Sequence, residues 1–519
     1  MTQTNFLVLI TDQHHADWLG CSGHPVVKTP NIDRLAQRGV RFSNFNVASP
    51  VCMPNRASLF TGRYPSVHGL RYNGCLLPQS ANTFVDVLRQ AGYATATIGK
   101  SHLQPFTARD ATSFKDFEAG VIEEAWKPDA GDYGQEAPDR YDAAGRYTIR
   151  TPYYGFDHVD MVTAHGDRAG GHYQQWFKEQ APNWRELLDR ANQLPHTYTC
   201  YQAYRTPIPE ELYHTSYIRN QAADWLCRQA DSEQPFFLFV SFPDPHHPFN
   251  PPGKYWDMYD PENFTVGTPY SAHTAPPPPL QYTREQFEQG RLPETPQIAF
   301  MAEDRHIREA MALSAGMITM IDDAIGGVLE ALKQSGKYDD TVVLFTSDHG
   351  DYLGDSNLML KGAWARPSIN RVPFIWADPR APRGLEDTAL SSTLDIAPTI
   401  LDRAGLRPYF GIQGRSLLPQ LGGGHGREEL LIEFNDSGYR MGFMNSPARV
   451  RTLLTDRWQL SVYHGQRWGE LYDRHADPQQ VNNVWDVPDY HPVRSELMER
   501  LMHQVIGTMD ESPRANRQA

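Results

Sequence analysis

Cysteine is scarce in this sequence, which limits the covalent and metal frameworks that the chain can form. Only five of the 519 residues are cysteines, and none of their spacings matches the paired ligands of a zinc site. An odd number of scattered cysteines also argues against a disulfide framework and favours a reducing compartment. The five are Cys21, Cys52, Cys75, Cys200 and Cys227.

Positive charge is also in short supply. The chain has 48 Lys and Arg against 62 Asp and Glu, so its formal net charge is -14. Nucleic acids are bound through clustered cations, and this balance therefore excludes a typical nucleic-acid partner. An anionic small molecule would have to be captured by a few local cations.

Long apolar runs, internal repeats and a targeting segment are absent from the sequence as well. The first residues lack the basic stretch and the small-residue cleavage site of a signal peptide, and no apolar run is long enough to cross a bilayer. We therefore expect a soluble, cytoplasmic protein without a membrane partner. The oligomeric state is left open, and a homo-oligomer is one option.

Short apolar runs alternate with amphipathic segments along most of the chain. Asn5–Thr11 and Thr341–Ser347 are near-continuous apolar runs, typical of parallel strands that are buried on both faces. This alternation predicts an α/β fold, with a large and mostly parallel sheet between layers of helices. Further strands are expected at 40–47, 94–98, 235–242 and 371–376, and helices at 29–36, 83–91, 217–228, 308–335 and 394–404.

The length of the chain indicates more than one domain, because 519 residues exceed one ordinary core. We predict a catalytic domain at 1–421, a small domain with an antiparallel sheet and a helix at 428–506, and a tail at 507–519. Glycines at 422–426 form the expected joint. The segments at about 105–209 and 250–300 lack periodicity and are expected to be loose insertions, the first of them over the mouth of the site. The prolines at 276–279 argue there against a regular element.

The most informative stretch runs from 49 to 63, with Cys52 near its start. Pro54 suits the first turn of a helix and Gly62 suits its end, so Cys52 is expected at a helix N-terminus, where unpaired amides favour an anion. Arg56 lies one turn further on and could hold an oxyanion group. Cys52 could instead be a small buried residue of a capped helix. A tyrosine-phosphatase loop would have arginine six places after the cysteine, where this chain has Ser58.

The pattern Cys52-x-Pro54-x-Arg56, followed by Ala-Ser-Leu at 57–59 and Thr-Gly-Arg at 61–63, resembles the signature of the type I sulfatases, which belong to the alkaline phosphatase superfamily. The resemblance implies an alkaline-phosphatase-like fold and a sulfuric ester hydrolase similar to arylsulfatases. It also implies that a separate formylglycine-generating enzyme oxidises Cys52 to formylglycine. The hydrated aldehyde of formylglycine is the nucleophile of that family.

Two pairs of polar residues follow two of the predicted buried strands. Asp12 and Gln13 follow the first, and Asp348 and His349 follow the run that ends at Ser347. Carboxylate and amide oxygens with one imidazole nitrogen suit a hard divalent cation. The resemblance implies that these four residues bind one such ion, with the group made from Cys52 as a further ligand. Calcium is the first choice and manganese the alternative, because Gln and His replace the commoner Asp and Asn.

The family's remaining functional positions can be matched one by one. Lys100 and His102 match a Lys-x-His pair, in which the lysine bridges nucleophile and sulfate and the histidine takes a proton from the hydrate. His246 and Lys361 match residues that lie near the leaving-group oxygen as acid or donor. The resemblance also implies Asn73 as a ligand of a non-bridging sulfate oxygen.

Two other functions compete with sulfate ester hydrolysis. A phosphonate monoester or phosphodiester hydrolase of the same superfamily would share the metal residues, but the phosphonate enzymes carry Tyr and Thr where this chain has Lys100 and His102. A non-catalytic sulfatase-like binding protein would keep the fold and lack the modified cysteine. The small-molecule partner that we expect is therefore a sulfate ester, whose alcohol the sequence does not identify.

Overall fold

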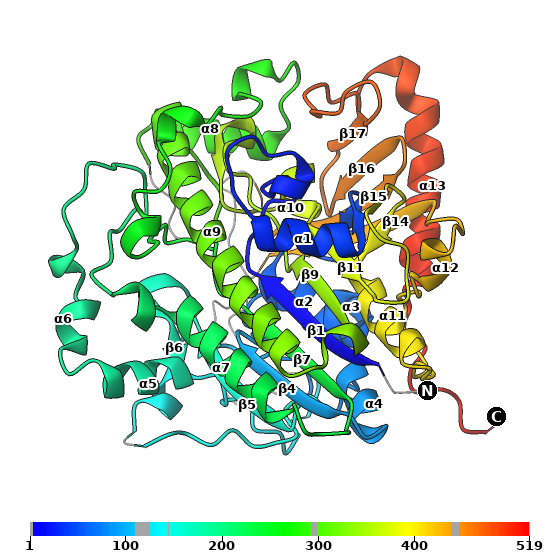
Figure 1. Ribbon diagram of the computed structural model, residues 1–519. Helices are drawn as coiled ribbons and strands as arrows, with labels where there is room; N and C mark the ends of the chain where they lie inside the picture. Colours follow the sequence, from blue (N-terminus) through cyan, green and yellow to red (C-terminus); the bar gives the residue numbers. More distant parts are fainter. Residues whose placement is uncertain are drawn as a thin grey trace.

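A nine-stranded sheet forms the centre of the molecule (Figure 1). The computed structural model describes residues 4–108, 125–127, 129–143, 145–291, 298–436, 444 and 446–517. The strand order is β12-β2-β11-β9-β1-β7-β4-β5-β6. These strands are β1 (Asn5–Thr11), β2 (Val40–Phe42), β4 (Ala94–Gly99), β5 (His158–Thr163), β6 (Gly170–Gly171), β7 (Phe236–Ser241), β9 (Thr341–Ser347), β11 (Phe374–Ala377) and β12 (Leu385–Asp387).

The five central strands run parallel, as the sequence predicts. Strand β1 pairs in parallel with β9 on one side and with β7 on the other, and β4 continues the parallel pairing from β7 to β5. Strand β11 is antiparallel to both of its neighbours, and β6 is antiparallel to β5. Because the central strands are parallel, their carboxyl ends meet at one edge, where polar side chains can gather.

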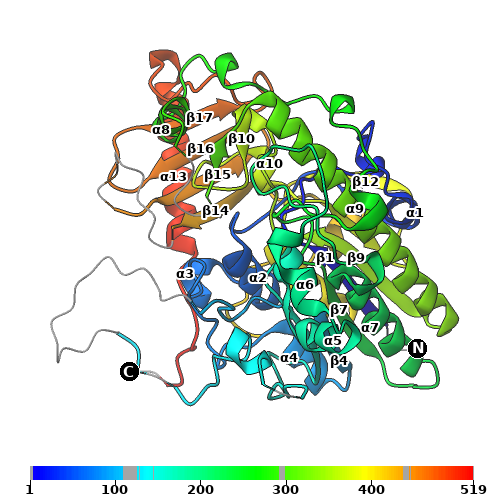
Figure 2. The same ribbon diagram turned by 90° about the vertical axis from the view of Figure 1, so that its left-hand side faces the viewer.

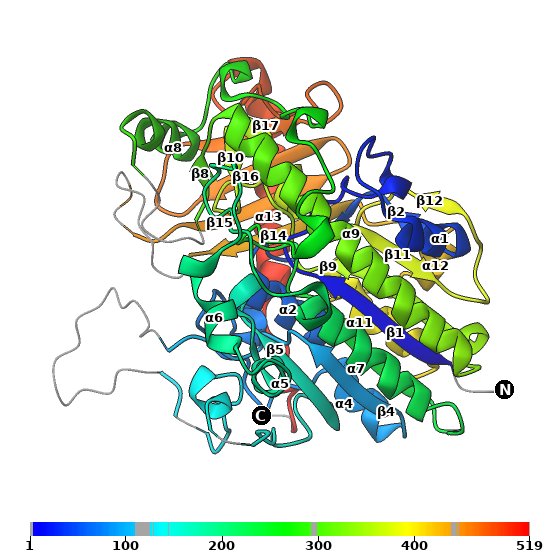
Figure 3. The ribbon, with the colours of Figure 1, turned by 60° about the vertical axis from the view of Figure 1, so that its left-hand side comes forward.

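Helices cover both faces of the sheet and bury alternate residues of β1. Phe6 and Val8 pack into one core with α2 (Cys52–Thr61), α4 (Phe84–Gln90) and α11 (Ile396–Arg403). Leu7 and Leu9 pack into the other core with α1 (Pro30–Arg38), α5 (His172–Gln180), α7 (His214–Arg228) and α9 (Asp304–Gln334), of which α7 and α9 lie in front of the sheet in Figure 3. Burying a large apolar side chain contributes about 1.5–3 kcal/mol, so the alternation stabilises both layers.

Helix α9 is long and apolar enough to cross a membrane by length and composition. In this protein, however, 83% of its most apolar 18-residue window is buried. Ile321, Ile325 and Val328 of α9 share a core with Ile218 and Leu226 of α7. The apolar character of α9 is therefore accounted for by packing inside the protein.

A second, antiparallel sheet with the order β14-β15-β16-β17 lies beside the central one (Figure 2). Its strands are β14 (Glu429–Asn435), β15 (Arg449–Thr455), β16 (Trp458–Tyr463) and β17 (Gly469–Asp473). Leu497 and Leu501 of α13 (His491–Gly507) pack on Leu453, Leu460 and Leu471 of this sheet. The small antiparallel sheet with a helix agrees with the sequence, whereas the domain boundary between 421 and 428 stays a prediction.

The segment at 105–209 is more regular than the sequence indicates. It supplies β5, which extends the central sheet beside β4, and helix α5. The expectation of a loose insertion is therefore wrong for this part, although residues 109–124 lie outside the described residues. The pattern was missed because polar His158 and Asp160 interrupt the short apolar run of β5.

Three further expectations need correction. Within 250–300, α8 (Pro278–Glu288) begins inside the proline run, because Pro is tolerated in the first turn of a helix, where no backbone N–H is needed. The strand expected at 40–47 is broken into β2 and β3 (Phe45–Asn46), and the strand expected from 371 begins at Phe374. The other α-helices and strands of the described residues are α3 (Pro65–His68), α6 (Trp184–Leu188), α10 (Pro367–Asn370), α12 (Leu418–Leu421), β8 (Phe300–Met301), β10 (Leu358–Met359) and β13 (Ser391–Ser392).

Candidate active site

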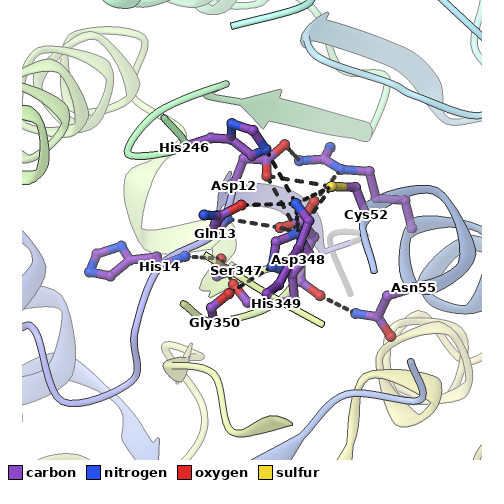
Figure 4. A network of polar contacts seen from close by, with 12 residues as sticks. Asp12, Gln13, His14, Cys52, Asn55, His246, Ser347, Asp348, His349 and Gly350 are labelled. Carbon is purple, nitrogen blue, oxygen red and sulfur yellow. Dashed lines mark hydrogen bonds and ion pairs between the residues drawn. The ribbon is translucent and has the colours of Figure 1, made fainter. Parts of the chain in front are cut away.

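The carboxyl ends of β1, β4, β7 and β9 and the N-terminus of α2 meet at one buried site (Figure 4). Cys52 is the first residue of α2 and is 1% exposed. Gly62 ends the helix in the left-handed conformation, with φ 62°. Asn55 fixes the first turn of α2 against β9, because its side-chain amide donates to the carbonyl of Asp348 at 2.5 Å. The strand-end residues therefore face the helix N-terminus.

Four side chains form a compact set of possible metal ligands. One ligand atom each of Asp12, Cys52, Asp348 and His349 lies within 4.8 Å of the others, and all four residues are buried. His349 Nδ1 donates to the carbonyl of Gly350 at 2.8 Å, which directs Nε2 towards Cys52 Sγ at 3.0 Å. Two carboxylates and an imidazole nitrogen fit a divalent cation.

Gln13 adds an amide oxygen to this set. Its side-chain amide nitrogen donates to Asp351 Oδ2 at 2.5 Å, which leaves Oε1 facing the site, where it accepts from Lys361 Nζ at 2.8 Å. The backbone N–H of Gln13 also donates to Asp348 Oδ1 at 3.1 Å. Burial raises the pKa of Asp351 to about 6, although the hydrogen bond from Gln13 opposes this shift. All the residues expected as metal ligands are thus brought together.

Arg56 contacts the carboxylates of Asp12 and Asp348, whereas the sequence suggested contact with an oxyanion. Its Nε donates to Asp348 Oδ2 at 2.8 Å, and Nη2 lies 3.5 Å from Asp12 Oδ2. Nη1 donates to the carbonyl of Lys100 at 2.9 Å and to Ser241 Oγ at 3.0 Å. Arg56 therefore connects the ends of four strands, β1, β4, β7 and β9, and offsets the charge of two buried carboxylates.

Lys100 lies at the end of β4 and pairs with Asp12. Its ammonium also donates to Nε2 of His165 at 2.6 Å. Burial alone would raise the pKa of Asp12, but Lys100, His165, His246 and Arg56 more than offset this and hold it well below its usual range. Asp12 is therefore kept as a carboxylate.

Lys361 occupies the middle of the site. Its Nζ lies 2.8 Å from Gln13 Oε1, 3.1 Å from both Cys52 Sγ and His349 Nε2, and 3.2 Å from His246 Nε2. Burial and Asp12 raise the pKa of the Cys52 thiol, yet Lys361, His349 and Lys100 outweigh them and lower it. Burial lowers the pKa of Lys361, but Cys52, Asp12 and Asp348 more than offset this and raise it.

The other predicted residues differ in how they face the site. His246 Nδ1 donates to the carbonyl of His247 at 2.6 Å, so Nε2 accepts from Lys361. His102 has φ 60°, and its ring stacks on Phe106 with centroids 4.0 Å apart. Burial and Lys100 hold the pKa of His102 well below its usual range. Asn73 Oδ1 accepts from the backbone N–H of Met53 at 3.2 Å, beside Cys52.

Two residues near the site were missed by sequence reasoning. His165 follows β5, so it would have been found as another strand-end residue if β5 had been predicted. Glu136 accepts from the backbone N–H groups of His102, Leu103 and Gln104 at 2.9–3.0 Å, and so fixes the loop after β4. Nothing in the local pattern around Glu136 indicates this role, because these three N–H groups are more than thirty residues away in the chain.

Comparison with known proteins identifies relatives along almost the whole chain. The model of a family described as Sulfatase matches residues 4–406, and one described as N-sulphoglucosamine sulphohydrolase, C-terminal, matches residues 359–506. An arylsulfatase of Clostridium perfringens is 27% identical over 513 residues, covering 97% of this chain and 94% of the relative. The multifunctional alkaline phosphatase superfamily protein PehA of Trinickia caryophylli is 28% identical, covering 99% and 97%.

The fold is also similar to that of solved structures. The phosphonate monoester hydrolase of Agrobacterium radiobacter superimposes with a TM-score of 0.76 at 24% identity, covering 98% of this chain and 97% of that one. At this level of identity the likeness concerns the fold, namely the large sheet with its helices and the C-terminal antiparallel sheet.

Proposed function

The chain belongs to the sulfatase family, whose members hydrolyse sulfuric esters, and from that premise we propose that it cleaves sulfate monoesters with a nucleophile made from Cys52. The observation that carries the proposal is the position of Cys52. It begins a helix, within ligand distance of Asp12, Asp348 and His349, in a sequence that matches the family's modification signature. A cysteine with a purely structural role would not require charged groups such as Asp12 and Asp348 around it.

The nucleophile in this proposal is formylglycine, made from Cys52 by a formylglycine-generating enzyme that acts as a partner in the cytoplasm. The carbon that carried sulfur then carries two hydroxyl groups in the hydrated form. One hydroxyl attacks sulfur as the ester bond to the alcohol breaks. The sulfate is then bonded to that hydroxyl's oxygen. We propose that His102, which its lowered pKa keeps neutral, accepts the proton of the other hydroxyl while the carbon–oxygen bond to the sulfate breaks, which releases sulfate and restores the aldehyde.

We further propose that Asp12, Gln13, Asp348 and His349 hold one divalent ion, calcium as first choice and manganese as the alternative. When bound, the ion would offset negative charge at the sulfate and favour ionisation of the attacking hydroxyl. The donor set supports this assignment, since two carboxylates, an amide oxygen and an imidazole nitrogen converge in a buried site.

The remaining proposed roles are binding of the sulfate and protonation of the leaving oxygen. We propose that Lys100 binds a sulfate oxygen, with Asn73 on another, and that Lys361 protonates the leaving oxygen. After Cys52 is converted, Asp12 and Asp348 still favour the charged form of Lys361, which therefore has a proton to give, whereas burial, His165 and His247 lower the pKa of His246 well below its usual range. His246 would therefore orient the ammonium of Lys361 through its Nε2 and would not itself supply the proton.

Mass spectrometry of the Cys52 peptide and kinetics test the proposal together. Protein co-expressed with a formylglycine-generating enzyme should carry an aldehyde at Cys52 and should hydrolyse 4-nitrophenyl sulfate, while Cys52→Ala should be inactive. Full activity of Cys52→Ala, or an active protein with an unmodified thiol, would refute the mechanism.

Phosphonate monoester hydrolysis is the second candidate. The 28% identity with PehA, a relative described as multifunctional, favours keeping it. Lys100 and His102 argue for sulfate, because the phosphonate enzymes carry Tyr and Thr at these two positions. A higher kcat/KM for 4-nitrophenyl phenylphosphonate than for 4-nitrophenyl sulfate would reverse this ranking.

A further inference from the structure

The side-chain amide of Gln13 is held at both ends by groups of opposite hydrogen-bonding type. Its Nε2 donates to Asp351 Oδ2 at 2.5 Å, while its Oε1 accepts from Lys361 Nζ at 2.8 Å. A carboxylate can only accept and an ammonium can only donate, so the amide cannot be reversed without losing both hydrogen bonds. The oxygen of Gln13 is therefore directed into the site and its NH2 group towards Asp351.

His247 offers a second acceptor to the same NH2 group. Its Nδ1 lies 3.3 Å from Gln13 Nε2 and accepts in the tautomer that carries the ring proton on Nε2. The contact with Asp351 is shorter and involves a charged acceptor, and such hydrogen bonds are roughly twice as strong as neutral ones. Asp351 is therefore the group that decides the orientation of the Gln13 amide.

The other oxygen of Asp351 holds the loop that carries Lys361. Its Oδ1 accepts from the backbone N–H groups of Leu353 and Leu360, both at 2.8 Å. Leu353 has φ 39° and Leu360 has φ 68°, in the left-handed region that a leucine rarely adopts. The carbonyl of Leu360 in turn accepts from the N–H of Tyr352 at 2.8 Å. These hydrogen bonds stabilise an unfavourable backbone conformation directly before Lys361.

Three N–H donors thus share one buried carboxylate, since Asp351 is only 4% exposed. A carboxylate can accept with both of its oxygens, whereas the amide of an asparagine has only one oxygen. In Asp351→Asn the new NH2 group would oppose either the NH2 group of Gln13 or two backbone N–H groups. The arrangement therefore requires an acid at position 351.

We propose that Asp351 is a positioning residue with two roles. It orients the amide of Gln13 so that the oxygen is available to the divalent ion, and it holds Leu360 so that Lys361 reaches Cys52. The proposal rests on the proposed function, which assigns Gln13 as a metal ligand and Lys361 as the proton donor. The contacts of Asp351 can nevertheless be tested without metal and without turnover.

A double-mutant cycle in chelator-treated protein tests the contact between Gln13 and Asp351. Asp351→Asn should lower the melting temperature of the wild type, because it places donors against donors. The same substitution should raise the melting temperature of Gln13→Glu, because it removes one of two carboxylates that face each other. Effects of equal sign and size in the two backgrounds would refute the contact. Should Asp351→Asn not fold, a folded double variant would support the proposal and an unfolded one would overturn it.

Calorimetry with calcium measures the consequence for the ion. Asp351→Asn should raise the Kd for calcium by about tenfold to a hundredfold, as is usual when a group that orients a metal ligand is removed. Addition of Gln13→Glu should reverse most of this loss, because the pair then carries its original total charge and an oxygen again faces the ion. The matched control is Asp160→Asn, since Asp160 in β5 is 2% exposed, and this variant should keep the Kd of the wild type.

The outcomes separate the two proposals. An unchanged Kd in folded Asp351→Asn would overturn the role of Asp351 and leave the metal site standing. A wild-type protein that binds neither calcium nor manganese would count against the proposed function, whereas the melting cycle would still decide the contact.

Hydrogen exchange tests the second role. The amide hydrogens of Leu353 and Leu360 should exchange at least about tenfold faster in Asp351→Ala than in the wild type, because both lose their acceptor. Asp160→Ala should leave these two amides unchanged. Slow exchange in folded Asp351→Ala would refute the role of Asp351 in holding the loop before Lys361.

Discussion

The imidazole ring of His165 lies parallel to that of His246, with the ring centroids 3.6 Å apart and an angle of 7° between the planes. His165 also accepts from Lys100 Nζ at 2.6 Å. One residue that follows β5 thus contacts both Lys100, which we propose to bind the sulfate, and His246, which we propose to orient Lys361.

Replacing His165 with phenylalanine removes the hydrogen-bond acceptor of Lys100 but keeps a ring that can stack on His246. This variant therefore separates the effects of the two contacts. We expect His165→Phe to lower kcat/KM for 4-nitrophenyl sulfate by about tenfold to a hundredfold, mainly through KM, because Lys100 loses the partner that orients it. His165→Asn, which can still accept, should recover part of the loss. The control is His425→Asn, because His425 is exposed in the loop between α12 and β14. Equal kinetics for the Phe and Asn variants would rule out orientation of Lys100 by His165.

Glu136 should stabilise the loop that follows β4. Its carboxylate accepts hydrogen bonds from three backbone N–H groups and from the hydroxyl of Tyr153, the last at 2.6 Å. In Glu136→Gln one oxygen is replaced by an NH2 group that faces donors, so we expect the free energy of unfolding to fall by about 1–3 kcal/mol. Denaturant unfolding measures this, with exposed Glu211→Gln as the control. An unchanged midpoint would mean that the loop does not depend on this carboxylate.

Metal removal should lower thermal stability in a way that depends on Asp348. A ligand at a hundred times its dissociation constant adds about 2.7 kcal/mol to the stability of the folded state. We therefore expect chelator-treated protein to melt at a lower temperature and added calcium or manganese to restore it, while Asp348→Asn shows no such response. Elemental analysis of the purified protein would identify the ion. A wild-type protein that neither contains nor responds to a divalent ion would refute the assignment of these ligands.

Acid should destabilise the fold through buried histidines such as His68. Burial lowers the pKa of His68 to about 3, from about 6.5 in an unfolded chain. Between these values the unfolded state binds more protons, so the stabilising effect of a neutral His68 is present at pH 7 and is lost as the pH falls from about 6.5 towards 3. The free energy of unfolding of the wild type, relative to His68→Asn, should therefore drop by about 3 kcal/mol between pH 7 and 4.

Unfolding curves at several pH values check this expectation. The difference between wild type and His425→Asn, at an exposed position, should change much less with pH. A difference between wild type and His68→Asn that stays constant from pH 7 to 4 would show that His68 is not held neutral by burial.

The parts of the site that lie at the ends of strongly apolar strands could be predicted from the sequence. Asp12 and Asp348 follow such strands, and parallel pairing of β1 with β9 brings them together. The helix at Cys52 was recognisable from Pro54 and Gly62. These features can be recognised from the local sequence, because a strand that is buried on both faces of a parallel sheet is a continuous apolar run.

His165 and the contact between Gln13 and Asp351 could not be predicted in this way. Strand β5 gains its apolar surroundings from β4 and α5, so its own sequence is a weak signal. Asp351 contacts the amide of Gln13 although it lies 338 residues further along the chain. Such contacts depend on tertiary packing, and the local periodicity of the sequence does not indicate them.

The balance of charge around Cys52 has a consequence for the maturation of the enzyme. Arg56, Lys100 and Lys361 meet Asp12, Asp348 and the thiol of Cys52, whose lowered pKa favours the anion. As a thiolate, Cys52 makes these six groups neutral in sum, and replacing its sulfur with an uncharged aldehyde leaves one positive charge in excess. In the mechanism that we propose, oxidation of this one side chain would create the nucleophile and, with or without the divalent ion, make the net charge of the cluster more positive by one unit, which favours binding of a sulfate ester.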